Sequence, residues 1–140
     1  MKRSMIFFLL SFSFFASAEE CQKARVRYIF DRQYVYEAVE LCREKTPDNV
    51  IFYLSSTCVK KQCEILKREK KELKVKARYS NIGSPGFKLC QELGGVPQIF
   101  EFQFKDSPNQ TWQSSERCLF GKKDFVEISL LTREWKPFIK

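Results

Sequence analysis

Ser84-Pro-Gly-Phe-Lys-Leu-Cys-Gln-Glu-Leu-Gly-Gly95 is the stretch in which most local signals agree. Ser84 suits the N-cap of a helix, because its hydroxyl can accept a hydrogen bond from a first-turn amide. Pro85 suits the first helical position, where its missing donor costs nothing. The next three side chains fall three residues apart and predict one buried helix face: Phe87, Cys90 and Leu93. Gly94-Gly95 predicts a left-handed stop, so the stretch indicates a short capped helix that one thiol can fasten to the domain.

The residues after this helix alternate in the manner of β-strands. Val96 to Phe104, Thr111 to Phe120 and Phe125 to Leu131 predict three strands. Turn residues at 107–110 and 121–124 separate them. A helix followed by an antiparallel β-meander predicts an α+β fold in which the short capped helix covers one face of the sheet.

The N-terminal half is also predicted to be rich in strands. Ala24 to Phe30 alternates as an amphipathic strand, and Val50 to Leu54 is a short apolar run of strand type. The segment between them is ambiguous, and helical spacing of three residues favours a helix over about 32–44: Val35, Val39 and Cys42. On that helix three glutamates would face the solvent: Glu37, Glu40 and Glu44.

Residues 1–18 have the pattern of a secretory signal. Lys2 and Arg3 precede an apolar run, and Ala16-Ser17-Ala18 offers a cleavage site with small residues. The run is shorter than the roughly 20 residues that a membrane-spanning helix needs. We therefore expect residues 19–140 to form a single exported domain, periplasmic or secreted, with no transmembrane segment after cleavage.

Six cysteines in a small exported chain predict a disulfide framework. The expected pairs join neighbours in order: Cys21 with Cys42, Cys58 with Cys63, and Cys90 with Cys118. A zinc site is disfavoured because Cys58 and Cys63 have the wrong spacing and the chain contains no histidine. The sequence thus predicts no metal and no cofactor.

Positive charge is concentrated in one segment. Without Lys2 and Arg3 the chain has 23 basic and 17 acidic residues, a net charge of +6. Residues 60–78 alone hold nine basic residues and three glutamates, which is also +6. The basic residues are Lys60, Lys61, Lys67, Arg68, Lys70, Lys71, Lys74, Lys76 and Arg78. The rest of the predicted domain is therefore neutral.

This basic segment fits two structures. The apolar spacing fits a helix face, whereas Leu73 to Tyr79 alternates and can pair with Cys63 to Lys67 as a long hairpin, which we favour. Such a surface predicts an anionic partner, either an envelope polymer or lipid headgroups, or else a protein. A dedicated nucleic-acid site is disfavoured, because no aromatic residues are interleaved with the cations between residues 59 and 78. A plain solvated surface remains the alternative.

Short motifs resemble the small exported bacterial DUF333 domain, a haemolysin-like family. They are Asn81-x-x-Ser84, Cys90, Gly94-Gly95 and Cys118-x-Phe120, within residues 81–131. This chain departs from the family where it has Ile82-Gly83 in place of Pro-Ala, and Gly121-Lys-Lys in place of a Pro-Asp-Gly turn. The resemblance implies export and a bridge between Cys90 and Cys118, and it implies little about activity.

The sequence disfavours an enzyme. The absence of histidine removes the most frequent general base and metal ligand, and no Gly-x-Ser-x-Gly elbow is present. We expect a non-enzymatic, exported, disulfide-stabilised binding protein that uses the basic segment. The alternative is an extracytoplasmic enzyme or enzyme inhibitor with an unrecognised site.

Overall fold

The computed structural model describes residues 20–74 and 84–140. The helices and strands are β1 (Glu20–Phe30), β2 (Gln33–Lys45), β3 (Ile51–Ser55), η1 (Ser56–Lys61), α1 (Glu64–Lys67), α2 (Pro85–Glu92), β4 (Val96–Phe104), β5 (Gln113–Phe120), β6 (Asp124–Glu127), α3 (Ile128–Trp135) and η2 (Lys136–Phe138).

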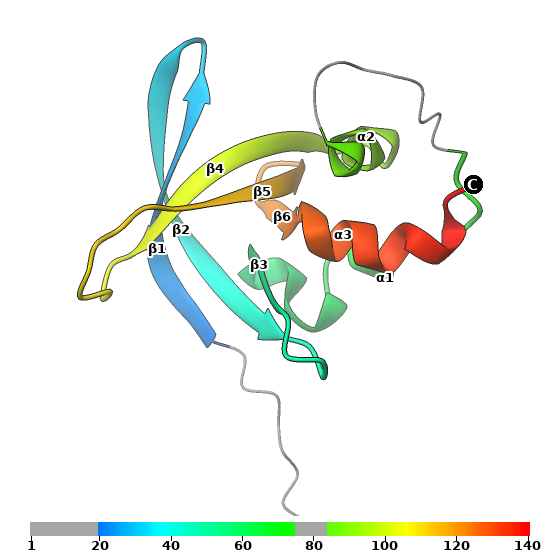
Figure 1. The fold of residues 1–140 in the computed structure, drawn as a ribbon, viewed down its shortest axis with the longest axis horizontal. Helices are drawn as coiled ribbons and strands as arrows, with labels where there is room; N and C mark the ends of the chain where they lie inside the picture. The colour runs from blue at the N-terminus through cyan, green and yellow to red at the C-terminus, as the bar shows by residue number, and fades with distance from the viewer. Residues whose placement is uncertain (1–19, 75–83) are drawn as a thin grey trace, which may run out of the picture.

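The strands form a closed antiparallel barrel in the order β1-β2-β3-β6-β5-β4 (Figure 1). Each half of the chain supplies one three-stranded meander. The meanders join where Ala24–Arg27 of β1 pairs with Glu101–Phe104 of β4, and where Leu54 of β3 pairs with Val126 of β6. The predicted α+β class is confirmed. The predicted C-terminal meander is present, but it is half of a barrel rather than an open sheet covered by a helix.

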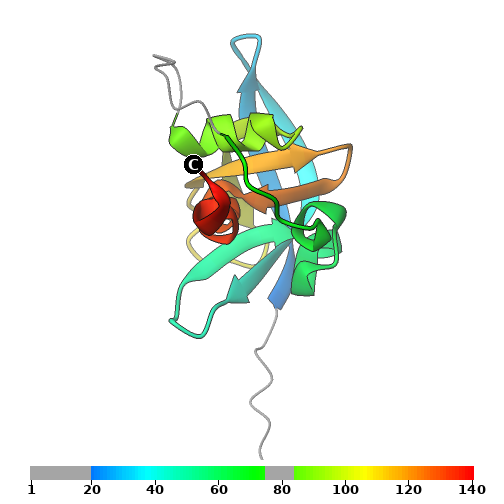
Figure 2. The same ribbon diagram turned by 90° about the vertical axis from the view of Figure 1, so that its right-hand side faces the viewer.

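Two apolar cores result from this closure. Phenylalanines from β4 and β6 fill the barrel interior together with Val26 and Leu41. The second core lies outside the barrel wall, where Leu54, Cys118 and Val126 pack against side chains such as Leu131 and Trp135 of α3. The helices gather on this side (Figures 1 and 2). β3, β5 and β6 are therefore buried on both faces where they pass between the two cores.

The predicted helix is present as α2, with changes at both ends. The Ser84 side chain makes no capping bond and instead donates a hydrogen bond to Glu116 over 3.4 Å. Gly94 has the expected positive φ of 86°. Gly95 does not, and it is needed for space, because a Cβ there would lie 2.4 Å from the Cys118 sulfur. One glycine therefore ends the helix, and the other admits the disulfide.

The helix predicted over 32–44 is wrong, because this segment is the strand β2. It pairs with β1 from Phe30↔Gln33 to Glu20↔Arg43, and its last residues pair with β3. The connecting turn uses Asp31 and Arg32, both at positive φ. Thirteen residues of ladder hydrogen bonds outweigh a local helical spacing of apolar residues.

The hairpin predicted in the basic segment is also wrong in its first arm. Residues 64–67 form the helical turn α1, which buries Ile65 and Leu66. Leu73 makes a parallel bridge with Ile139 near the C-terminus. The rest of the predicted second arm, from residue 75, lies outside the described residues. The last predicted strand is shorter than expected, because the chain turns into α3 at Ile128.

Three disulfides connect the parts of the fold in the expected order: Cys21–Cys42, Cys58–Cys63 and Cys90–Cys118. The first crosses the β1–β2 ladder, and the last ties α2 to β5. Disulfides of this kind are typical of proteins outside the reducing cytoplasm. Among the described residues, no helix has the length and apolar character needed to cross a membrane.

Candidate functional site

The most unusual side chain in the barrel is Arg117 of β5, whose side chain is only 2% exposed. Its neighbour Cys118 points to the outer core, where it is bonded to α2. Because successive side chains of a strand alternate between its faces, Arg117 must point into the barrel. The guanidinium group is therefore buried inside the barrel, on the face of β5 opposite the helices.

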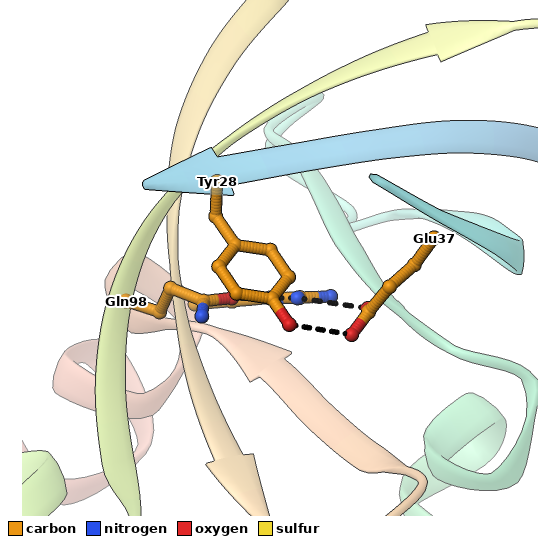
Figure 3. A network of polar contacts seen from close by, with 4 residues as sticks. Tyr28, Glu37 and Gln98 are labelled. Carbon is orange, nitrogen blue, oxygen red and sulfur yellow. Dashed lines mark hydrogen bonds and ion pairs between the residues drawn. The ribbon is translucent and has the colours of Figure 1, made fainter. Parts of the chain in front are cut away.

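Two polar side chains hold this guanidinium in place (Figure 3). Gln98 of β4 accepts hydrogen bonds from Nε over 2.8 Å and from Nη2 over 2.6 Å. Nη2 also donates to Glu37 of β2 over 3.3 Å. The other oxygen of that carboxylate accepts a hydrogen bond from the Tyr28 hydroxyl over 2.8 Å. We call these four residues the Arg117 network.

Aromatic rings surround the cation. The guanidinium carbon lies 4.9 Å from the ring centre of Phe100, 5.1 Å from that of Phe125 and 5.6 Å from that of Tyr28. Such contacts compensate part of the cost of taking the charge out of water. They also leave little room for Arg117 to change its position, so the network is rigid on the barrel side.

The local environment shifts two pKa values in the network. Burial lowers the pKa of Arg117, and the Glu37 carboxylate opposes that shift. The hydrogen bond to Glu37, with burial, raises the pKa of Tyr28. Tyr28 therefore stays a neutral donor. Arginine stays protonated even when buried, so the site keeps one fixed positive charge.

Arg117 lines a cavity of about 610 Å³ that opens between β2 and the β5–β6 turn. Its charged lining residues are basic on the β5–β6 side, at Arg117, Lys122 and Lys123, and acidic on the β2 side, at Glu37 and Glu40. The basic residues exceed the acidic ones by one. Serine and threonine side chains at residues 55–57 and the apolar Val39, Leu119 and Phe125 complete the wall.

Several cations of the basic segment are paired with acidic side chains. Lys61 and Lys70 both pair with Glu134 of α3, over 2.8 and 3.3 Å. Arg68 pairs with Glu64 and donates to the carbonyl of Leu93. The remaining described members lie on the surface: Lys60, Lys67, Lys71 and Lys74. Lys76 and Arg78 lie outside the described residues, and none of the seven described members lines the Arg117 cavity.

Sequence reasoning missed the whole Arg117 network. One signal could have found it: if Cys118 is bonded to the helix, Arg117 must point to the opposite face of its strand. Glu37 was assigned to a solvent-facing helix and instead points to Arg117 from β2. Its negative charge interrupted the apolar alternation of Val35, Val39 and Leu41 that would have revealed the strand.

Comparison with family models, curated proteins and solved structures finds no match to this chain. The class of this protein is therefore described from its own fold and site. It is a disulfide-bonded antiparallel β-barrel with a buried arginine that lines a cavity in its side. In the described part of the chain, no cluster of three or more aspartate, glutamate or cysteine side chains could hold a metal ion.

Proposed function

We propose that this chain is an exported, non-enzymatic binding protein, and that its ligand is a small molecule whose anionic group contacts Arg117. The observation that carries the proposal is the position of the Arg117 guanidinium, which is almost fully buried and yet lines the cavity. A charge kept at this depth costs free energy, and ligand recognition is a reason for a fold to retain one.

The free hydrogen-bonding capacity of Arg117 indicates an acceptor group on the ligand. Its Nε and Nη2 atoms donate to Gln98 and Glu37, while Nη1 makes no hydrogen bond to any residue between 20–74 or 84–140. A carboxylate or phosphate oxygen is the strongest partner for such a donor, and the interaction gains strength away from bulk water. Lys122 and Lys123 add positive charge at the cavity wall.

The polar groups of the cavity favour binding over catalysis. Ser55 is the buried hydroxyl in the wall, and its oxygen accepts from the Phe125 amide over 3.1 Å while lying 2.9 Å from the Thr57 hydroxyl. A serine engaged in this way holds β3 against β6 and is not poised as a nucleophile. No histidine exists to activate it. Ser55 therefore gives no support to the alternative of an enzyme.

The basic segment remains a prediction from the sequence. Glu134 already neutralises part of the charge of Lys61 and Lys70, so this segment offers less free charge than its composition suggests. The resemblance to DUF333 likewise stays a prediction, and it supports export only. We still expect an anionic ligand, but we place its contact at Arg117 in the barrel and not in the basic segment.

A binding experiment with Arg117→Met tests the proposal, because methionine fills a similar volume without a charge. Three probes are titrated by NMR into the oxidised chain at low salt: succinate, glucuronate and inorganic phosphate. We expect at least one probe to shift resonances of Gly121–Lys123. Arg117→Met should lower the affinity for that probe by about 10- to 150-fold, which corresponds to the loss of one hydrogen bond to a charged group.

Arg133→Met is the matched control, because Arg133 is an exposed arginine on α3 that pairs with Asp48 away from the cavity. It should leave probe binding unchanged. The proposal is wrong if no probe shifts the cavity residues of the wild-type chain, or if Arg117→Met stays folded and binds as tightly as the wild type.

A further inference from the structure

Exposed apolar side chains are concentrated at one end of the barrel. Of the residues that the structure describes, eight large hydrophobic ones are strongly exposed, and six of these lie on the tip of the β1–β2 hairpin or near the start of β4. We call these six the hairpin patch: Ile29, Phe30, Tyr34, Tyr36, Val96 and Ile99. The hairpin stands away from the rest of the fold (Figure 1). Soluble proteins rarely leave such a patch uncovered without a function.

The hairpin patch surrounds a groove of about 570 Å³. Pairing between β1 and β4 ends at Arg27↔Glu101, and beyond this point the two strands are no longer paired. Five of the six patch residues line the resulting groove, with Phe87 of α2 also in the wall. The same surface thus presents both a protruding apolar tip, at Ile29 and Phe30, and an apolar groove beside it.

The size of the patch matches that of a protein interface. Its six residues are 51–69% exposed. With roughly 200 Å² for each full side chain, they offer roughly 700 Å² of surface per chain. A stable protein–protein interface buries about 800 Å² on each partner. Tyrosine and phenylalanine, which make up half of the patch, are also enriched at the centre of such interfaces.

We infer that the hairpin patch is the surface through which two copies of this chain form a twofold dimer. In that arrangement the apolar tip of each copy fills the groove of the other, as an isologous interface requires. The charged groups at the inner end of the groove are compatible with an apolar occupant such as this tip, because Arg27 and Glu101 already form an ion pair with each other. Covering them leaves no buried charge without its counterion.

Sedimentation equilibrium of the oxidised chain tests the inference. At about 100 µM, where a dimer with micromolar affinity is almost fully formed, we expect the mass of a dimer. Phe30→Asp and Ile99→Asp place a charge on opposite sides of the interface, and each should weaken dimerisation at least about tenfold. Both residues are exposed, so circular dichroism should show that the variants stay folded.

Ile51→Asp is the matched control, because Ile51 is 46% exposed on β3 and lies outside the hairpin patch. It should leave the dimer intact. A photo-cross-linking chain with Phe30→p-benzoylphenylalanine identifies the occupant of the groove. A cross-link to a second copy supports the inference. A monomeric mass at this concentration, equal weakening by Ile51→Asp, or a cross-link only to lipid or another protein overturns it.

Discussion

Gly95→Ala should destabilise the fold by forcing a side chain against the Cys90–Cys118 disulfide. A Cβ at this position would lie 2.4 Å from the Cys118 sulfur, 2.8 Å from Cε1 of Phe120 and 3.0 Å from the Cys90 sulfur. Real Cβ atoms do not approach other atoms so closely, so something must move. The two sulfur atoms are bonded to each other and fasten α2 to β5, which leaves them little freedom.

The expected cost follows from this overlap. Overpacking a well-filled core costs about 1–3 kcal/mol, and we expect a value near the upper end, about 3 kcal/mol, because the obstruction is covalently fixed. Gly94→Ala is the matched control. It has φ of 86° and no atom within 4 Å of its added Cβ, so it should pay only the left-handed backbone penalty of about 1–2 kcal/mol.

Urea unfolding of the oxidised proteins measures both costs, provided that the denaturant slope is unchanged. The decisive comparison repeats each substitution in a chain with Phe120→Leu, and in one with Cys90→Ala and Cys118→Ala. Removing an obstructing atom should recover about 1 kcal/mol or more for Gly95→Ala and nothing for Gly94→Ala. The reasoning is refuted if Gly95→Ala costs less than Gly94→Ala, or if neither background reduces its cost.

Three further predictions concern side chains elsewhere in the fold. Arg117→Met should change the free energy of unfolding by less than about 1.5 kcal/mol, because the carboxylate that it leaves unpaired, Glu37, is 41% exposed and can be solvated. A larger loss in thermal or urea unfolding would make Arg117 primarily structural. Burial alone would raise the pKa of Glu134, but Lys61 and Lys70 outweigh it and hold that pKa below its usual value. The stability that Glu134 contributes is therefore present above its unfolded-state pKa of about 4.3 and is lost as the pH falls below that value. Glu134→Gln should therefore make the melting temperature decrease less between about pH 5 and pH 3. An unchanged decrease in the variant would contradict this prediction. Arg32→Gly should raise the free energy of unfolding by about 0.5–1 kcal/mol, because the relief of a left-handed residue at φ of 64° exceeds the added entropy of glycine in the unfolded chain; a destabilised hairpin in hydrogen exchange would argue against it.

Local chemistry made several parts of this fold predictable. The residues around Ser84–Gly95 combine a proline at a helix start with a glycine at its end, and these signals act within a few residues. Val96–Phe104 alternates strongly enough to identify β4. The disulfides follow from the cysteine count and from pairing each cysteine with the next one along the chain.

The errors occurred where distant contacts decided the structure. β2 has the apolar spacing of a helix because Glu37, at an inward position of the strand, is charged. The apparent helical spacing arises because one charged residue interrupts an alternating pattern. The turn at Asp31 and Arg32 has no glycine or asparagine, so the usual hairpin signal is also missing. The prediction for the basic segment was wrong for a different reason. Its alternation from Leu73 onward suggested the second arm of a hairpin, but Leu73 forms a bridge with Ile139 near the C-terminus.

The sequence by itself determined the helix α2 and the alternating strand β4, because each depends on side chains close together in the chain. It also predicted the disulfide framework, because the six cysteines pair in the order in which they occur. Only the tertiary structure decided that the strands close into a barrel, which requires β1 to pair with β4. It alone brought Arg117 to Glu37, 80 residues away. No local pattern encodes such a pairing. The candidate site consists of contacts of this kind, and for that reason the fold was partly predictable and the site was not.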